Sequence, residues 1–126
     1  MLCEPRTARR ARLLVSAALH TWNLSDLVET GMLMVSELVG NSVQHTACRL
    51  IHVSVRRIAI DRVRIGVTEN SSRLPEMGGG ESGREGGRGL FLVEVMGDRW
   101  GYDLHRRGKT VWVELVVEGG EKPGLA

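Results

Sequence analysis

The segment SELVGNSVQH, residues 36–45, reads as the end of an amphipathic helix. On a helical wheel at 100° per residue, Glu37, Gly40, Asn41 and Gln44 fall on one side. The apolar residues of this segment and of the preceding turns fall on the other side, and they are Val28, Met32, Val35, Leu38, Val39 and Val43. The pattern predicts a helix from about residue 25 to 45, with one face in a core.

Glu37 and Asn41 are the first candidate site residues, because they are four positions apart on the polar side of this helix. That spacing places the two side chains about 6 Å apart along the axis. An amide oxygen suits Mg²⁺, and a carboxylate can orient or deprotonate a hydroxyl group. His45 lies one turn further on and could reach the same ligand. From the spacing alone, a solvated helix face explains the same residues.

The spacing of the apolar residues differs before and after this segment. Residues 7–22 repeat apolar positions at helical spacing, and Ser25 and Asp26 are N-cap candidates for the helix that follows. After residue 45, apolar and polar residues alternate, which predicts strands. The expected strands span about residues 51–56, 63–67, 100–105 and 109–117.

Glycine is concentrated in one stretch, with seven of the chain's 16 glycines between Gly78 and Gly89. Residues 70–88 carry no periodicity and predict a loop, and residues 90–96 predict a short buried helix that ends at Gly97. A glycine-rich loop that runs into a helix N-terminus can bind phosphate through backbone N–H groups. No P-loop motif is present, because the Gly108–Thr110 segment lacks the upstream glycine.

The element order is helix, helix, strand, strand, loop, helix, strand, strand. It predicts an α+β fold, a two-layer sandwich with a mainly antiparallel sheet and helices on one face. The 126 residues form one domain, with a core from about residue 8 to 117 and a tail over 118–126.

Charge and cysteine content narrow the function classes. A net charge of +2 does not require a polyanionic partner, and the arginines of residues 6–12 read as a solvated helix face. Cys3 and Cys48 are too few for a disulfide framework or a zinc site. No apolar run is long enough for a membrane span or a signal peptide. We therefore expect a reduced, cytoplasmic protein that binds neither nucleic acid nor membrane.

The series formed by residues 36–45, the glycine-rich loop, GGRGLFLVEVMGDRWG (86–101) and GKTVWVEL (108–115) resembles the GHKL ATPase superfamily. Within it, the chain is similar to the small anti-sigma-factor serine/threonine kinases and their stand-alone ATP-binding relatives. The resemblance spans about residues 8–117 and implies the histidine kinase-like ATPase fold, also called the Bergerat fold. It also implies ATP and Mg²⁺ as ligands, with residues 70–88 as the ATP lid.

The resemblance implies a role for each motif residue. Glu37 would be the general base, Asn41 the Mg²⁺ ligand, and His45 a residue near the phosphates. The phosphate-binding glycine box would consist of Gly87, Arg88, Gly89 and Leu90. On the adenine side, Glu69 stands where the family has Asp, and Thr110 matches the threonine that supports this acid. The glycine that normally follows the acid is missing.

Two functions are compatible with these motifs. The first is an ATP-dependent serine/threonine protein kinase that acts on a partner protein, with a sigma factor or an anti-anti-sigma-type protein as the implied partner. The alternative is a non-catalytic module that sequesters such a regulator, with weak or no nucleotide binding, and Glu69 with the missing glycine motivates it. A homodimer formed through the N-terminal helix is also expected from the resemblance.

Overall fold

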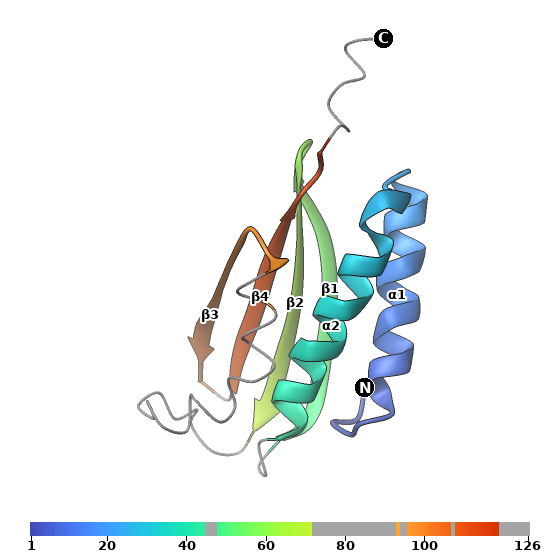
Figure 1. Cartoon of the computed structure of the whole chain (residues 1–126). Coiled ribbons are helices and arrows are strands. Elements are labelled where there is room, and N and C mark those ends of the chain that lie inside the picture. Colours follow the sequence, from blue (N-terminus) through green and yellow to red (C-terminus); the bar gives the residue numbers. More distant parts are fainter. Residues whose placement is uncertain (45–47, 72–92, 94–95, 107, 119–126) are drawn as a thin grey trace, which may run out of the picture.

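The computed structural model describes residues 1–44, 48–71, 93, 96–106 and 108–118. They form two helices packed on one face of a four-stranded antiparallel sheet (Figure 1), so the predicted α+β sandwich is confirmed. The elements are α1 (Thr7–Thr21), the 3-10 helix η1 (Ser25–Leu27), α2 (Val28–Val43), β1 (Cys48–Ala59), β2 (Arg62–Ser71), β3 (Arg99–His105) and β4 (Gly108–Val116).

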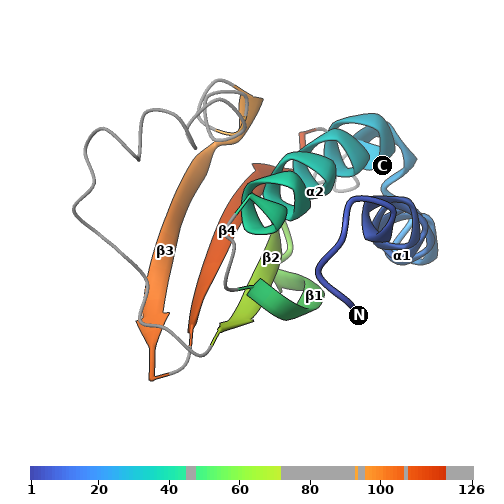
Figure 2. The same ribbon diagram turned by 90° about the horizontal axis from the view of Figure 1, so that it is seen from below.

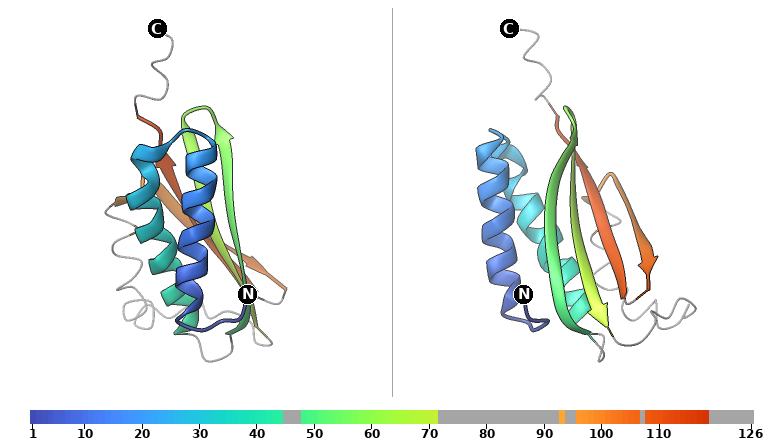
Figure 3. Two further views of the ribbon diagram at one scale, coloured as in Figure 1. Left: turned by 90° about the vertical axis from the view of Figure 1, so that its right-hand side faces the viewer. Right: turned by 180° about the vertical axis from the view of Figure 1, so that it is seen from behind.

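The sheet has the strand order β1-β2-β4-β3, so β2 and β4 form its centre. Alternate residues of a strand point to opposite faces. On the face toward the helices, β2 and β4 bury an aliphatic layer made of Val63, Ile65, Val67, Val111, Val113 and Leu115. Figures 2 and 3 show α1 and α2 together on that side of the sheet.

The two helices approach closely at Gly31 of α2. A Cβ atom there would lie 2.9 Å from Leu19 Cδ1 and 3.0 Å from Val15 Cγ1, both on α1. Leu19, Val15 and Ala11 are buried at a spacing of four, which is the helical period expected for α1. Glycine at this position therefore lets α2 pack against both α1 and the sheet.

The connection between the helices differs from the prediction. Asn23 adopts a positive φ of 64°, and the Leu24 N–H donates to the Leu19 carbonyl at 2.8 Å, which ends α1. Ser25 and Asp26 lie in η1, and the N-cap of α2 is Leu27 with no side-chain capping bond. The expected capping role of Ser25 and Asp26 is therefore wrong for α2.

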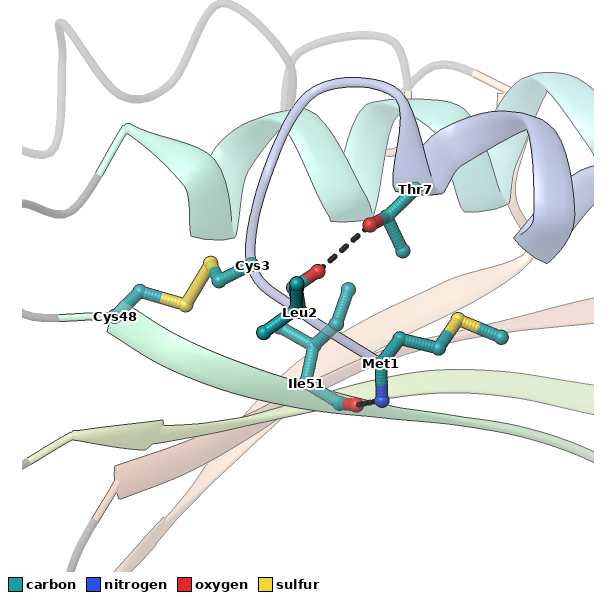
Figure 4. The surroundings of a disulfide bond; sticks show 6 residues. All are labelled: Met1, Leu2, Cys3, Thr7, Cys48 and Ile51. Atoms are coloured by element: carbon teal, nitrogen blue, oxygen red, sulfur yellow. Dashed lines mark hydrogen bonds between the residues drawn. A yellow bond between two sulfur atoms is a disulfide. The ribbon is translucent and has the colours of Figure 1, made fainter.

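The prediction that the two cysteines stay reduced is also wrong. Cys3 and Cys48 form a disulfide with their Cα atoms 6.0 Å apart (Figure 4). They are 45 positions apart in sequence, and the fold brings them together by placing the N-terminal residues along the start of β1. In the part of the chain that the structure describes, no helix is long and apolar enough to cross a membrane.

One predicted boundary differs from the structure, and the predicted third helix is described only in part. The loop predicted from residue 70 begins later, because Asn70 and Ser71 still pair with β1. Val93 and Met96 are helical, as expected for the short third helix, and Val93 is fully buried. The remaining residues of the predicted lid and the tail from residue 119 lie outside the described residues.

Candidate functional site

Glu37 and Asn41 lie in the last two turns of α2. Asn41 is only 4% exposed, and Glu37 is half-buried, so the solvated-face alternative does not describe them both. Among the described residues, neither side chain forms a hydrogen bond or an ion pair with another side chain or with the backbone. The Asn41 amide and the Glu37 carboxylate thus have hydrogen-bonding capacity that a ligand oxygen or a cation at this helix end could use.

Glu69 lies near the C-terminal end of β2 and is 2% exposed. It follows Ile65 and Val67 in the alternation, so its side chain is on the sheet face toward the helices. The C-terminal end of β2 and the C-terminal end of α2 lie at the same end of the molecule (Figure 1). The fold therefore brings Glu69 to the end of the molecule at which Glu37 and Asn41 lie.

Gly108, the first residue of β4, closes the same end of the sheet. A Cβ atom at this position would lie 1.8 Å from the Glu69 carbonyl oxygen, so only glycine fits without moving β2 or β4. Gly108 pairs with Asn70, and Lys109 pairs with Glu69. The glycine thus sets how closely the start of β4 approaches the backbone of the predicted adenine-side acid.

Thr110 does not lie on the Glu69 side of the sheet. Its hydroxyl oxygen is 2.6 Å from that of Thr68 and 2.7 Å from His105 Nε2, on the face turned away from α1 and α2. Lys109 is the β4 residue that stands opposite Glu69 on the helix-covered side. The expectation that Thr110 supports the acid is therefore not met by the fold. The alternation of the apolar residues Val111, Val113 and Leu115 in the sequence already indicates that Thr110 lies on the opposite face of this strand.

The other predicted site residues are not placed. His45, Gly87, Arg88, Gly89 and Leu90 lie outside the described residues. Within the described ranges, no group of three His, Cys, Asp or Glu side chains could hold a metal ion. Mg²⁺ usually binds through one or two protein oxygens together with substrate phosphates. The amide oxygen of Asn41 is a ligand type that fits that mode of binding.

A cavity of about 750 Å³ lies at the opposite end of the sheet. Residues of η1, the first turn of α2 and the end of β4 line it, together with Met96, Gly97 and Asp98. None of the predicted site residues is among them. This hollow is therefore separate from the α2–β2 end that carries Asn41 and Glu69.

An arginine-rich cluster occupies the open face of the sheet, and sequence reasoning missed it. Arg62 and Arg64 of β2 hydrogen-bond to Glu114 of β4, which is 1% exposed, and Arg64 stacks 4.0 Å from the centroid of the Trp112 ring. The pKa of the Glu114 carboxyl lies below its ordinary value. Burial alone would raise this pKa, but it is outweighed by the hydrogen bond from Arg64 and by the positive charges of Arg64, Arg99 and Arg62.

Comparison with known proteins places the chain in a family. The model of the histidine kinase-like ATPase domain matches residues 2–115. No curated protein matches the chain. The chain is similar in structure to the histidine kinase domain of the Erythrobacter litoralis EL346 blue-light activated histidine kinase, with a TM-score of 0.55 and 23% identity over 74% of this chain and 47% of that one.

A second solved structure of the Erythrobacter litoralis EL346 blue-light activated histidine kinase gives a TM-score of 0.56 and 21% identity, and the match covers 76% of this chain and 33% of that one. The chain thus spans about half or less of the length of these solved relatives. At such identities the likeness shows the fold. The family match extends over nearly the whole chain, from the N-terminal residues through β4. The chain belongs to the histidine kinase-like ATPase domain family.

Proposed function

We propose that this chain binds Mg-ATP at the shared end of α2 and β2 and transfers the terminal phosphoryl group to a serine or threonine of a partner protein. The observation that carries the proposal is the pair Glu37 and Asn41, one turn apart on α2, where Asn41 is 4% exposed and Glu37 is half-buried at the end of the helix that Glu69 of β2 also reaches. Membership of the ATPase domain family supports the nucleotide.

Each residue has a distinct task in this proposal. The Asn41 amide oxygen would hold Mg²⁺, which would supply positive charge beside the phosphate groups. Glu37 accepts the hydroxyl proton of the partner's serine, which is general-base catalysis by a positioned carboxylate. Glu69 accepts a hydrogen bond from the amino group of the adenine. The partner proposed from the sequence resemblance is a sigma factor or an anti-anti-sigma-type protein.

Two substitutions and one control test the proposal. Glu37→Gln should keep Mg-ATP affinity within about twofold and reduce phosphoryl transfer by about 10²–10⁴-fold, the usual contribution of a general base. Asn41→Ala should abolish the Mg²⁺ dependence of nucleotide binding. Glu29→Gln is the matched control, because Glu29 is an exposed glutamate at the other end of α2. Transfer that survives Glu37→Gln unchanged would remove Glu37 as the base.

One observation favours a second function, a binding module without catalysis. The residue opposite Glu69 is Lys109 instead of a hydroxyl-bearing residue, so the adenine side departs from the pattern implied by the resemblance. Calorimetric titration with Mg-ATP and Mg-ADP separates the two functions. Absence of binding up to millimolar nucleotide, with partner capture intact, would favour the binding module.

The proposal includes a homodimer formed through α1. Leu13 and Leu14 are both exposed on this helix. Exposed leucines on a short helix suit a helix–helix contact between copies. Sedimentation at micromolar concentration of the chain and of the Leu13→Lys variant tests this, because the variant should shift a dimer to a monomer.

A further inference from the structure

The first three residues form a short strap, called here the N-terminal strap (Met1–Cys3), along the edge strand β1. The Cys3 N–H donates to the Arg49 carbonyl at 3.0 Å, and the Ile51 N–H donates to the Met1 carbonyl at 2.9 Å. The Met1 nitrogen in turn donates to the Ile51 carbonyl at 3.0 Å (Figure 4). The strap therefore pairs with β1 as an extra antiparallel strand and covers its edge at Arg49–Ile51.

Two further links fasten the strap. The Thr7 hydroxyl, in the first turn of α1, donates to the Leu2 carbonyl at 2.7 Å. The Cys3–Cys48 disulfide then joins the strap covalently to the first residue of β1. The bond closes a loop over residues 3–48, which contains both helices and therefore Glu37 and Asn41.

The strap itself lies at the surface. Leu2 is 59% exposed, its bridge partner Leu50 is 47% exposed, and both cysteines are only half-buried. The buried core is built from α1, α2 and the sheet and does not include Met1 or Leu2. Segments that bury little apolar surface open locally at low free-energy cost. Loss of the covalent bond should therefore free the strap while the two-layer core stays folded.

We propose that the Cys3–Cys48 disulfide is a reversible redox latch that holds the N-terminal strap on β1 and, through it, the nucleotide-binding end of α2. A thiolate of a small thiol or a dithiol protein attacks one sulfur and forms a mixed disulfide, and a second thiol resolves it. The two cysteines gain two electrons and two protons and become thiols, while the reductant becomes a disulfide. An oxidised thiol pool restores the latch by the reverse exchange.

The regulatory output rests on the proposed function. With the latch closed, the disulfide joins Cys48, the first residue of β1, to the segment before α1, and Cys48 follows Gln44, the C-cap of α2, by four positions. With the latch open, three hydrogen bonds at the seam with β1 are released, and the start of β1 loses its covalent link to the segment before α1. Mg-nucleotide affinity should then fall at least about fivefold, the lower end for coupled sites.

The test compares the oxidised full chain, the same chain reduced with dithiothreitol, and the Cys3→Ser/Cys48→Ser double variant. Amide hydrogen exchange at position 3 and at Ile51 reports the strap, and amides of β2 and β4 serve as the internal control. Reduction and the double variant should each accelerate exchange at the strap seam by about tenfold or more, while the amides of the central strands still exchange more slowly than the seam because the core stays folded. Thr7→Val, in oxidised protein, is a matched control that weakens the strap without touching the latch.

Three results would overturn the latch. They are unchanged exchange at the seam after reduction, global loss of protection in the central strands, and failure of the bond to re-form in a glutathione redox buffer. Calorimetry with Mg-ATP on the oxidised and reduced chains then tests the output. If neither form binds Mg-ATP, the proposed function fails, whereas the exchange data still decide the latch. Equal affinity in both forms would overturn the coupling between latch and site.

Discussion

Thr110 lies opposite Thr68 in the β2–β4 register, and their hydroxyl oxygens are 2.6 Å apart on the sheet face turned away from α1 and α2. Glu69, one residue after Thr68, is buried on the other face. A single step along β2 thus separates the open face from the face that carries the proposed nucleotide site.

Because Thr110 and Glu69 lie on opposite faces of the sheet, we expect Thr110→Val to keep Mg-ATP affinity within about twofold. Glu69→Ala should weaken affinity by about tenfold or more, since one hydrogen bond to the adenine is worth about 1.4 kcal/mol. Isothermal calorimetry measures both, and Thr68→Val is the control for loss of the hydroxyl pair. A tenfold loss in Thr110→Val would contradict the assignment of faces.

Two glycines of α2 make opposite predictions for stability. Gly31→Ala should lower the free energy of unfolding by about 1–3 kcal/mol, because the new methyl group would press on Leu19 and Val15. Gly40→Ala should raise it by about 0.5–1 kcal/mol, since among the described residues no atom outside the neighbouring helix backbone lies within 4 Å of the added Cβ, and alanine favours the helix. Urea denaturation of both variants gives the comparison. Equal effects would show that α1 and α2 do not pack closely at Gly31.

The Glu114 cluster predicts a stability that depends on pH. The folded-state pKa of Glu114 is lowered, so its contribution is present at neutral pH. The contribution is lost as the pH falls below roughly 4.3, the ordinary value, toward the lowered pKa. Glu114→Gln should cost about 2 kcal/mol at pH 7, the scale of hydrogen bonds to a charged group. The cost stays moderate because the side chains of Arg62 and Arg64 are each 29% exposed.

Denaturant unfolding of the chain and of Glu114→Gln at pH 7 and pH 3 tests this dependence. The difference between the two proteins should be smaller at pH 3 than at pH 7, because the carboxyl group of the unfolded chain is protonated below its ordinary value of roughly 4.3 and the contribution of the lowered folded-state pKa declines from there. Glu118→Gln is a suitable control, because Glu118 is exposed and follows the same strand. A difference that stays constant with pH would exclude a charged Glu114 as its source.

The disulfide predicts a large loss of global stability when it is removed. The loop between Cys3 and Cys48 spans 45 positions, and closing a loop of this length in the unfolded chain is worth about 4 kcal/mol in the chain-entropy model. The Cys3→Ser/Cys48→Ser variant should therefore unfold at lower urea concentration than the oxidised chain. The reduced chain should match the variant, and a difference between them would indicate effects of serine itself.

The helices and strands follow from local periodicity, which the sequence determined by itself. The 3.6-residue period of residues 7–43 and the alternation in 51–67 and 100–117 arise from neighbours in the chain, so they predicted α1, α2 and an antiparallel sheet. The spacing of Glu37 and Asn41 likewise required only helix geometry. Because alternate residues of a strand face opposite sides, the apolar positions Val111 and Val113 also indicate in the sequence that Thr110 faces outward.

Tertiary structure alone decided three features. The pairing of Cys3 with Cys48 depends on the chain's return along β1, and their separation in sequence carries no information about it. The burial of Asn41 is visible only in the folded chain, since a helical wheel assigns a side but not what covers it. From the sequence, Glu114 is expected to be an exposed polar residue on the outer face of its strand. It is buried because arginine side chains from β2 and β3 form ion pairs with it and cover it. Packing between distant segments sets each of these, whereas periodicity reports only neighbours in the chain.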